Sequence, residues 1–405
     1  MVKSKAAVLY ESGYDMPYVK SEPLKIETVT LASPGPNELL IQVRAAGLCH
    51  SDLSVINGSR KRQTPMVLGH EAAGVVTEVG ENVTGFDVGD HVVCAFVPSC
   101  GQCLPCKEGR PALCEPGAAS NNAGEMFSGG TRIQKEDGTD VYSHIGISGF
   151  SEYSIVSTNS AIKIDPDLPF DQAALFGCAV ITGLGAVINT AAVKPGTDVA
   201  VVGLGGIGMN AVLGSVLAGA KSIIAVDLNE EKLAHAKELG ATAVYNASDD
   251  DVVEQIKADT AGGVHYAFET AGVVPAMKTA YNITRRGGTT ITSGLPDPKD
   301  EFSFPQVVLT AEERTIKGSY LGSCVPTEIF RGIFLCLNKA NYLSTNSLAR
   351  RLHSKISMKV LTGFTRANHS ELSLSFPQRD ISDPQLWVAL LIVCTTMGLT
   401  RAKSG

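Results

Sequence analysis

The sequence of 405 residues lacks the features that mark several large classes of protein. It holds 34 Lys and Arg against 41 Asp and Glu, a net charge of −7, so no overall positive charge attracts nucleic acid. Its first residues contain only a short apolar run, Ala6 to Tyr10, so we expect no signal peptide. It also lacks internal repeats and long low-complexity tracts. We expect a cytoplasmic protein with no nucleic-acid or membrane partner.

The composition that is present suits a two-domain α/β protein. A chain of 405 residues is long for one domain. The hydrophobic content of 44% and the 41 glycines suit a large core with many tight turns. Ten cysteines without a secretory signal indicate metal sites and reactive groups rather than disulfides.

Four of the cysteines lie close together in the sequence, at Cys100, Cys103, Cys106 and Cys114. The two CxxC steps share their middle cysteine, so three thiolates can converge from one turn, and the fourth follows after seven intervening residues. Four sulfurs with no open position form a closed structural Zn²⁺ site. The same spacing also suits an iron–sulfur cluster or a pair of disulfides, and the cysteines alone leave these alternatives open.

The pattern of the chain changes near residue 180. Before it, short β-type runs alternate with Gly and Pro, and we expect strands at Leu39–Val43, Ala73–Val79 and His91–Ala95. After it, strand, glycine turn and helix alternate, as is typical of a parallel sheet. The strands expected there are Asp198–Val202, Ser222–Val226, Val264–Glu269 and Thr289–Ser293.

A glycine motif follows the first of these later strands. It contains Gly203, Gly205, Gly206 and Gly208, and we expect a helix at Met209–Ala218. In a dinucleotide fold such glycines allow the tight turn, the approach of a pyrophosphate and close packing of helix on strand. The helix N-terminus offers free N–H groups to the phosphates. A glycine turn with a purely structural role is the alternative.

An acidic residue ends the next expected strand. Asp227 lies 19 residues after Gly208, where a carboxylate accepts hydrogen bonds from the adenosine ribose. A 2′-phosphate there would meet a like charge, so NAD is favoured over NADP. Lys232 is placed to reach the same ribose.

Three further residues suggest a second metal site. Cys49 and His70 are 21 residues apart, and Cys178 precedes the dinucleotide-type region. Alone, each is more often a buried thiol or a core histidine. Together, two Cys and one His leave a fourth position open, which is the arrangement of a catalytic zinc.

With these motifs in this order, the chain resembles the zinc-containing alcohol dehydrogenases of the medium-chain dehydrogenase/reductase superfamily, over roughly residues 5–326. The resemblance implies a GroES-like, mostly β catalytic domain over 1–180, with a structural zinc lobe at about 98–116. It implies a Rossmann domain with a doubly wound parallel sheet over 181–322 and a return to the catalytic domain over 323–405. It also implies a homo-oligomer, either a dimer or a tetramer.

The resemblance also assigns the metal ligands. Cys49, His70 and Cys178 would bind the catalytic zinc, and the four clustered cysteines a structural zinc, so that each subunit holds two Zn²⁺ ions. Glu71 matches a glutamate that can approach the catalytic metal. Asp52 matches the carboxylate that orients the ligand histidine through its other ring nitrogen.

The implied reaction moves a hydride between an alcohol and NAD, with an aldehyde or ketone as the product. Ser51 matches the hydroxyl that passes the alcohol proton toward solvent. Thr182 and Ile207 match positions that line the nicotinamide site, and His50 matches a residue that contacts the cofactor pyrophosphate.

Some positions depart from the family pattern. Ser54 stands where many relatives place the last histidine of the proton relay, so we expect the relay to end in the cofactor ribose and water, or in His50. Relatives that oxidise thiol adducts of formaldehyde carry an arginine near Ala118, whose absence weakens that alternative. A catalytically impaired nucleotide-binding relative is a further alternative. The run Arg60–Arg62 is either a solvated loop or a contact for a substrate carboxylate.

The last part of the chain departs most from the family pattern. Residues 341–405 hold 8 Lys and Arg against 3 Asp and Glu, whereas residues 1–340 hold 26 against 38. Ser373 stands near the place of a late arginine that binds pyrophosphate in relatives. The apolar run Leu386–Leu399 is too short to span a membrane. We expect this tail to pack poorly and to weaken cofactor affinity.

Overall fold

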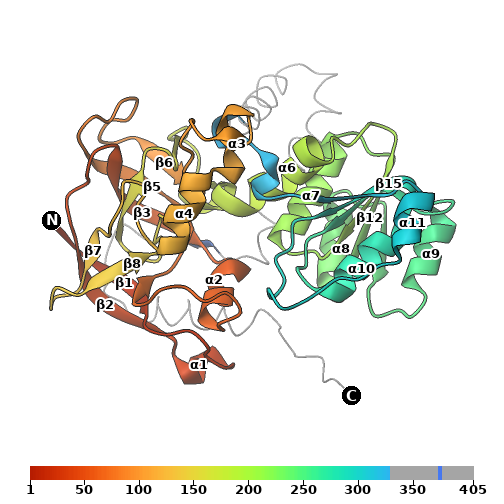
Figure 1. The fold of residues 1–405 in the computed structure, drawn as a ribbon, viewed down its shortest axis with the longest axis horizontal. Helices are drawn as coiled ribbons and strands as arrows, with labels where there is room; N and C mark the ends of the chain where they lie inside the picture. The colour runs from red at the N-terminus through yellow and green to blue at the C-terminus, as the bar shows by residue number, and fades with distance from the viewer. Residues whose placement is uncertain (329–372, 376–405) are drawn as a thin grey trace. The chain divides into compact units, whose positions relative to one another are not determined.

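The computed structural model describes residues 1–328 and 373–375. The contacts divide the described chain into two units. The first consists of Met1–Cys178 with the short strand β17 (Ser373–Ser375), and the second begins at Ala179. Figure 1 shows strands dominating the first unit and alternating helices and strands in the second.

The first unit consists of a small closed barrel and a second, mostly antiparallel sheet. The barrel strands, in spatial order, are β1 (Val2–Leu9), β2 (Leu24–Leu31), β7 (Ile133–Gln134), β8 (Asp140–Ser143) and β4 (Met66–Val67). The sheet has the order β10 (Ala161–Lys163), β6 (His91–Cys94), β5 (Glu71–Val79), β3 (Glu38–Gly47) and β17, with β9 (Tyr153–Ser157) also paired to β3.

Alternation of side chains explains why these runs form strands. In β2, Val29 and Leu31 are buried in the barrel core, whereas Thr28 is exposed and Thr30 half-buried. This period of two is that of a strand with one buried face. The strands expected at 39–43, 73–79 and 91–95 are confirmed, although β6 ends one residue earlier, at Cys94.

Short helices join the strands of the first unit. They are α1 (Tyr18–Ser21), α2 (His50–Ile56), α3 (Leu104–Lys107), η1 (Pro111–Leu113), α4 (Glu115–Ala123), α5 (Phe170–Leu175) and η2 (Phe176–Val180). A continuous helical stretch, Phe170–Thr190, is apolar enough to cross a membrane by length and composition, but 83% of its most apolar window is buried inside the protein. Such burial is that of a core helix.

The second unit is built on a parallel sheet. Its order is β13 (Ala243–Asn246), β12 (Ser222–Asp227), β11 (Asp198–Val202), β14 (Val264–Glu269), β15 (Thr284–Thr292) and β16 (Thr315–Gly318). Its helices are α6 (Ile181–Gly185), η3 (Ala186–Thr190), α7 (Gly206–Leu217), α8 (Glu230–Leu239), α9 (Val252–Asp259), α10 (Val274–Ile283), α11 (Gln306–Ala311) and η4 (Leu321–Ser323).

Both faces of the central strand β11 are buried. Ala200 and Val202 pack with Ile256 of α9 in one core cluster. Val199 and Val201 point to the opposite face because neighbouring residues of a strand alternate, and both are fully buried. A strand buried on both faces is typical of a parallel sheet covered by helices.

The strand order reverses direction between β11 and β14, so the sheet has the doubly wound order with β11 at its switch point. The predicted two-domain fold, GroES-like and Rossmann, is confirmed. β13 and β16 were not predicted from the sequence, and α7 begins three residues earlier than expected. The helix already starts at Gly206, with Gly205 as its N-cap.

Candidate metal centres and dinucleotide loop

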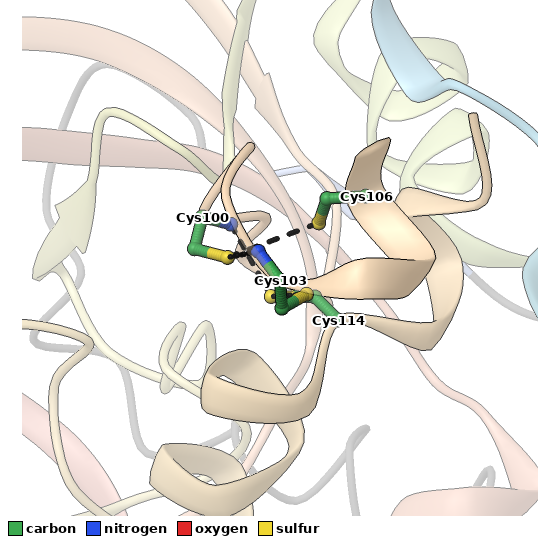
Figure 2. Close-up of side chains that lie close together, drawn as sticks. All are labelled: Cys100, Cys103, Cys106 and Cys114. Atoms are coloured by element: carbon green, nitrogen blue, oxygen red, sulfur yellow. Dashed lines mark hydrogen bonds between the residues drawn. The ribbon is translucent and has the colours of Figure 1, made fainter. Parts of the chain in front are cut away.

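The four clustered cysteines converge on one point (Figure 2). Cys103 caps α3, Cys106 lies within it and Cys114 caps α4. The Sγ atoms of Cys100 and Cys106 are 3.9 Å apart, and those of Cys103 and Cys114 are 4.0 Å apart. Sulfurs bound tetrahedrally to one Zn²⁺ would be separated by about 3.8 Å. None of the four cysteines forms a disulfide, and all four Sγ atoms lie within 4.8 Å of one another, which suits one ion rather than a cluster of several irons.

Backbone N–H groups favour the thiolate form in this lobe. The amides of Gln102 and Cys103 donate to Sγ of Cys100 at 3.3 and 3.2 Å, and those of Cys100 and Gly117 donate to Sγ of Cys114 at 3.2 and 3.4 Å. Backbone hydrogen bonds from Cys103 and Gln102 lower the pKa of Cys100 to about 6, whereas burial raises the pKa of Cys106 to about 12 and also raises that of Cys114. Because thiolates are the form that binds zinc, the residues of the lobe fit a structural zinc ion.

A second donor set lies in the first unit. Cys49 is the N-cap of α2, His70 immediately precedes β5, Glu71 begins it and Cys178 lies in η2. One donor atom from each of the four lies within 4.8 Å of the others. All are buried except Cys49, which is half-buried. The structure therefore brings together the three residues predicted to bind a catalytic metal, with Glu71 beside them.

The charges in this set favour a cation. The pKa of Cys49 is lowered well below its usual range, mainly by a hydrogen bond with Cys178 and further by His70, against the opposing effect of burial. Burial would lower the pKa of His70, but the neighbouring charges of Asp52 and Cys49 raise it well above its usual range. A buried thiolate beside an imidazole and a carboxyl group matches the donor set of a divalent soft ion such as Zn²⁺.

Asp52 lies directly behind His70. Its Oδ1 is 3.1 Å from Nδ1 of His70, and this leaves Nε2 as the ring nitrogen for a metal. The carboxylate also accepts the N–H groups of Cys49 at 3.2 Å and of Gly69 at 3.1 Å. Burial alone would raise the pKa of Asp52, but the charge of His70, the nearby ring of His144 and the hydrogen bond with His70 hold it below its usual value.

The sequence did not single out His144. Its Nδ1 lies 3.1 Å from the same Oδ1 of Asp52, and its ring is 1% exposed. Burial lowers the pKa of His144, so the ring is neutral near pH 7. No local motif marks this residue, because it follows β8 and meets Asp52 only through the fold.

Glu71 is held close to β3. It is fully buried, and its backbone pairs with that of Gly47. A Cβ on Gly47 would clash with the Glu71 carboxylate, so glycine at this position makes room for the acid beside the donor set.

Ser54 does not take the place of the missing relay histidine. It is 5% exposed, and its hydroxyl donates to the carbonyl oxygen of His50 at 2.9 Å, four residues earlier in α2. Ser51 is half-buried and His50 is exposed at the start of the same helix. This arrangement leaves His50 open to solvent next to Ser51, as expected if protons leave there.

The glycine loop has the space that a pyrophosphate needs. Gly203 has φ 95°, and a Cβ there would press on Ala271. A Cβ on Gly208 would clash with the carbonyl oxygen of Gly203, so the helix packs against the loop without room for a side chain. A Cβ on Gly205 would meet no atom within 4 Å. The open position is therefore the one predicted to face phosphate, and the loop fits a dinucleotide.

The acidic residue at the end of β12 is fixed against this loop. Asp227 accepts the N–H of Leu204 at 2.6 Å through Oδ2 and that of Asn229 at 3.0 Å through Oδ1. Asn229 caps α8, and its side chain accepts the N–H of Lys232, which is half-buried in the first turn. Asp227 and the start of α8 thus lie beside the glycine loop, as a ribose contact requires.

Thr182 and Ile207 lie on adjoining helices of the second unit. Thr182, in α6, is 5% exposed, and Ile207, in α7, is half-buried. A Cβ on Gly183 would clash with the carbonyl oxygen of Ile207, so the two helices are in close contact beside these residues.

One residue of the basic run Arg60–Arg62 has a structural role. Nη1 of Arg62 donates to the carbonyl oxygen of Asn121 at 3.1 Å and to Oδ1 of Asn122 at 2.9 Å, both at the C-terminal end of α4. A cation at a helix C-terminus is favourable. Lys61 and Ala118 are exposed.

Ser373, which stands near the expected place of the late arginine of relatives, is found in β17. Its backbone pairs with Gly47 of β3, in the sheet of the first unit. The residues of the apolar run at 386–399 lie outside the described residues.

Together, the fold, the glycine loop and the two sets of possible metal ligands are typical of a dinucleotide-binding dehydrogenase. Comparison with known proteins agrees. The description "Alcohol dehydrogenase GroES-like domain" matches residues 35–166, and "Zinc-binding dehydrogenase" matches residues 206–337.

Solved structures of the same kind cover most of the chain. An alcohol dehydrogenase zinc-binding domain protein from Burkholderia ambifaria is 33% identical, with a TM-score of 0.79, over 93% of this chain and 100% of that one. Benzyl alcohol dehydrogenase from Acinetobacter calcoaceticus is 30% identical, with a TM-score of 0.76, over 90% and 97%. A putative zinc-binding dehydrogenase from Sinorhizobium meliloti, solved with NADP, is 26% identical, with a TM-score of 0.68, over 82% and 88%. The chain belongs to the zinc-containing alcohol dehydrogenases of the medium-chain dehydrogenase/reductase superfamily.

Proposed function

We propose that the protein is an NAD-dependent alcohol dehydrogenase that transfers a hydride from the carbon of an alcohol to NAD⁺, with an aldehyde or ketone as the product. The observation that supports this most directly is the buried set of Cys49, His70 and Cys178, with Asp52 behind the histidine. A nucleotide-binding protein without this chemistry has no need of such a donor set.

The residues of the chain divide the work of the reaction. Cys49, His70 and Cys178 would hold a zinc ion, which when bound supplies a Lewis acid that lowers the pKa of the alcohol. Asp52 keeps the His70 ring in one orientation. Ser51 accepts the alcohol proton at its hydroxyl oxygen and passes it toward solvent beside the exposed His50.

We propose NAD rather than NADP as the cofactor. Asp227 is fixed by two backbone N–H groups beside the glycine loop, and its negative charge disfavours a 2′-phosphate. The neighbour solved with NADP is 26% identical, so its cofactor does not determine that of this chain.

For the substrate we propose a primary alcohol, with benzyl alcohol as the first compound to test. Benzyl alcohol dehydrogenase is 30% identical to this protein, and the match covers 90% of the present chain. Oxidation of a thiol adduct of formaldehyde is the alternative, and Ala118 offers no cation to bind an acidic adduct.

The test combines metal analysis with a cofactor assay. We expect two zinc ions per chain and NADH formation from benzyl alcohol or ethanol, with much slower formation of NADPH from NADP⁺. Activity only with formaldehyde and added glutathione would establish the thiol-adduct reaction instead. A zinc-loaded protein that reduces neither cofactor with any of these substrates would contradict the proposal.

A further inference from the structure

His144 shares the carboxylate that orients His70. Nδ1 of His70 and Nδ1 of His144 each lie 3.1 Å from the same atom, Oδ1 of Asp52. Both rings and the carboxylate are at most 4% exposed, so water does not compete for these contacts. One buried acid therefore faces two imidazoles, of which only His70 belongs to the donor set beside Cys49.

The contact of His144 with Asp52 selects one form of its ring. Oδ1 of an ionised carboxylate is only an acceptor, so a facing Nδ1 must carry a proton to avoid repulsion between lone pairs. Oδ1 already accepts the N–H of Gly69 at 3.1 Å. Nδ1 of His144 approaches at hydrogen-bond distance but without hydrogen-bond alignment. Its N–H adds a positive dipole that holds the carboxylate in place.

His144 also contacts the metal-ligand ring directly. The ring centroids of His70 and His144 are 5.5 Å apart, and the planes meet at 89°. Phe96 makes a similar edge contact with His70, at 5.7 Å and 89°. These two edge contacts restrict rotation of the His70 ring about its Cβ–Cγ bond.

The backbone that follows His144 adopts costly conformations. Ile145 and Ser148 have φ of 47° and 55°, in the left-handed region that β-branched residues avoid. The turn is closed by the N–H groups of Ile147 and Ser148, which donate to the carbonyl oxygen of His144 at 3.1 and 3.3 Å. In return, the hydroxyl of Ser148 accepts the N–H of His144 at 3.1 Å. Such strain persists only where the surrounding structure fixes it.

We propose that His144 is a positioning residue of the catalytic metal site, which acts through Asp52 to fix the orientation of His70. The 144–148 turn holds the His144 ring in the required place. The inference rests on the proposed function, because it requires that His70 binds zinc.

Two near-isosteric variants test this role. In His144→Asn the amide nitrogen falls near the place of Nδ1, whereas in His144→Gln it falls near that of Nε2. We expect His144→Gln to weaken zinc binding at the Cys49 site by about 10- to 100-fold, as is common when a residue behind a ligand is lost. His144→Asn retains nearly the affinity of the unmodified protein. His91→Gln serves as the control, because His91 contacts Phe170.

Zinc affinity is measured on the full chain by competition with a chromophoric chelator, with the zinc of the four-cysteine lobe as an internal reference. Melting temperatures of the metal-free variants are compared in parallel. Equal zinc affinity in His144→Gln and the unmodified protein would overturn the inference. Equal losses in both His144 variants, accompanied by lower metal-free melting temperatures, would also overturn it in favour of a packing role.

The same data separate this inference from the proposed function. If the unmodified chain binds two zinc ions but oxidises no alcohol, the proposed function fails while the comparison of zinc affinities still decides the role of His144. If the unmodified chain binds only the zinc of the lobe, both fail.

Discussion

At the scale of single residues, burial separates cysteines of very different reactivity. Cys94 is fully buried, and burial raises the pKa of its thiol to about 12. Cys324 is 1% exposed, and burial likewise raises its pKa to about 12. Cys49 has a lowered pKa in a half-buried position. Only the thiolate reacts quickly, so the three thiols should differ by orders of magnitude.

Alkylation of the zinc-free protein tests this difference. With iodoacetamide at pH 8, we expect Cys49 to be modified early while Cys94 and Cys324 stay unmodified, because a thiol of pKa about 12 is on the order of 0.01% ionised at pH 8. Raising the pH toward 12 increases the thiolate of Cys94. Peptide mapping by mass spectrometry identifies the sites. Cys49→Ala should lose the early label at residue 49 only, because Cys100, whose pKa is lowered to about 6, also reacts early. Early labelling of Cys94 would show that the core opens.

At the scale of elements, the loop between β11 and α7 contains two glycines with different physical reasons. Gly208 is needed for packing, because a side chain would clash with the carbonyl of Gly203. Gly205 faces open space and adopts φ −77°, which any residue tolerates. Only a bound pyrophosphate would require glycine at position 205.

Alanine substitutions separate these two reasons. We expect Gly205→Ala to keep the melting temperature of the unmodified protein but to weaken NADH binding by about tenfold, since the methyl group occupies the space of the phosphate. Gly208→Ala should lower the affinity for NADH and also the melting temperature, with a loss of about 1–3 kcal/mol in the free energy of unfolding. Fluorescence titration with NADH and thermal unfolding are the measurements. Unchanged NADH affinity in Gly205→Ala would contradict a pyrophosphate at this loop.

The zinc lobe is a second element with a separable role. Cys103 and its three partners lie on α3, α4 and the adjacent loop, whereas Cys49, His70 and Cys178 come from other parts of the first unit. We expect Cys103→Ser to lower the zinc content from two ions per chain to one and to reduce the melting temperature by several degrees. Atomic absorption and calorimetry measure both, with Cys94→Ser as the control. Loss of both ions would show that the two sites depend on each other.

At the scale of the whole molecule, β17 brings the chain back to the sheet of the first unit that contains β3. β17 pairs with β3 at Gly47, Ala46 and Ala45, immediately before Cys49. The pairing supplies hydrogen-bond partners to the stretch of β3 that leads into the metal site. Most of the basic residues of the tail precede β17, whereas the apolar run Leu386–Leu399 follows it.

Two truncations distinguish the strand from the tail. We expect a chain that ends at residue 376 to fold and to bind NADH at least as tightly as the full chain, in line with a tail that weakens cofactor affinity. A chain that ends at residue 372 lacks β17, leaves backbone groups of β3 unpaired and should melt at a lower temperature. Thermal unfolding and NADH titration compare the three chains. If ending the chain at residue 376 abolishes folding and NADH binding, the expectation about the tail is wrong.

Local patterns in the sequence were enough to predict much of the fold. Apolar runs bounded by turn signals, such as those of β3 and β11, were predicted as strands, and their side chains are mostly buried. β13 and β16 escaped prediction because they are short, four-residue strands whose residues are mostly half-buried or exposed. Their position is fixed by pairing with β12 and β15 rather than by their own sequence.

The sequence by itself identified the four clustered cysteines and the glycine loop, because each depends on residues a few positions apart. The CxxCxxC spacing brings thiolates together within one turn, and the glycines of 203–208 follow one strand directly. Only the tertiary structure placed His144 beside Asp52 and brought Cys49, His70 and Cys178 together from distant parts of the chain. His144 meets Asp52 only after the turn beyond β8 folds against α2, and the hydroxyl of Ser54 binds its own helix. Contacts between distant segments depend on how the whole unit packs, and no short pattern encodes them.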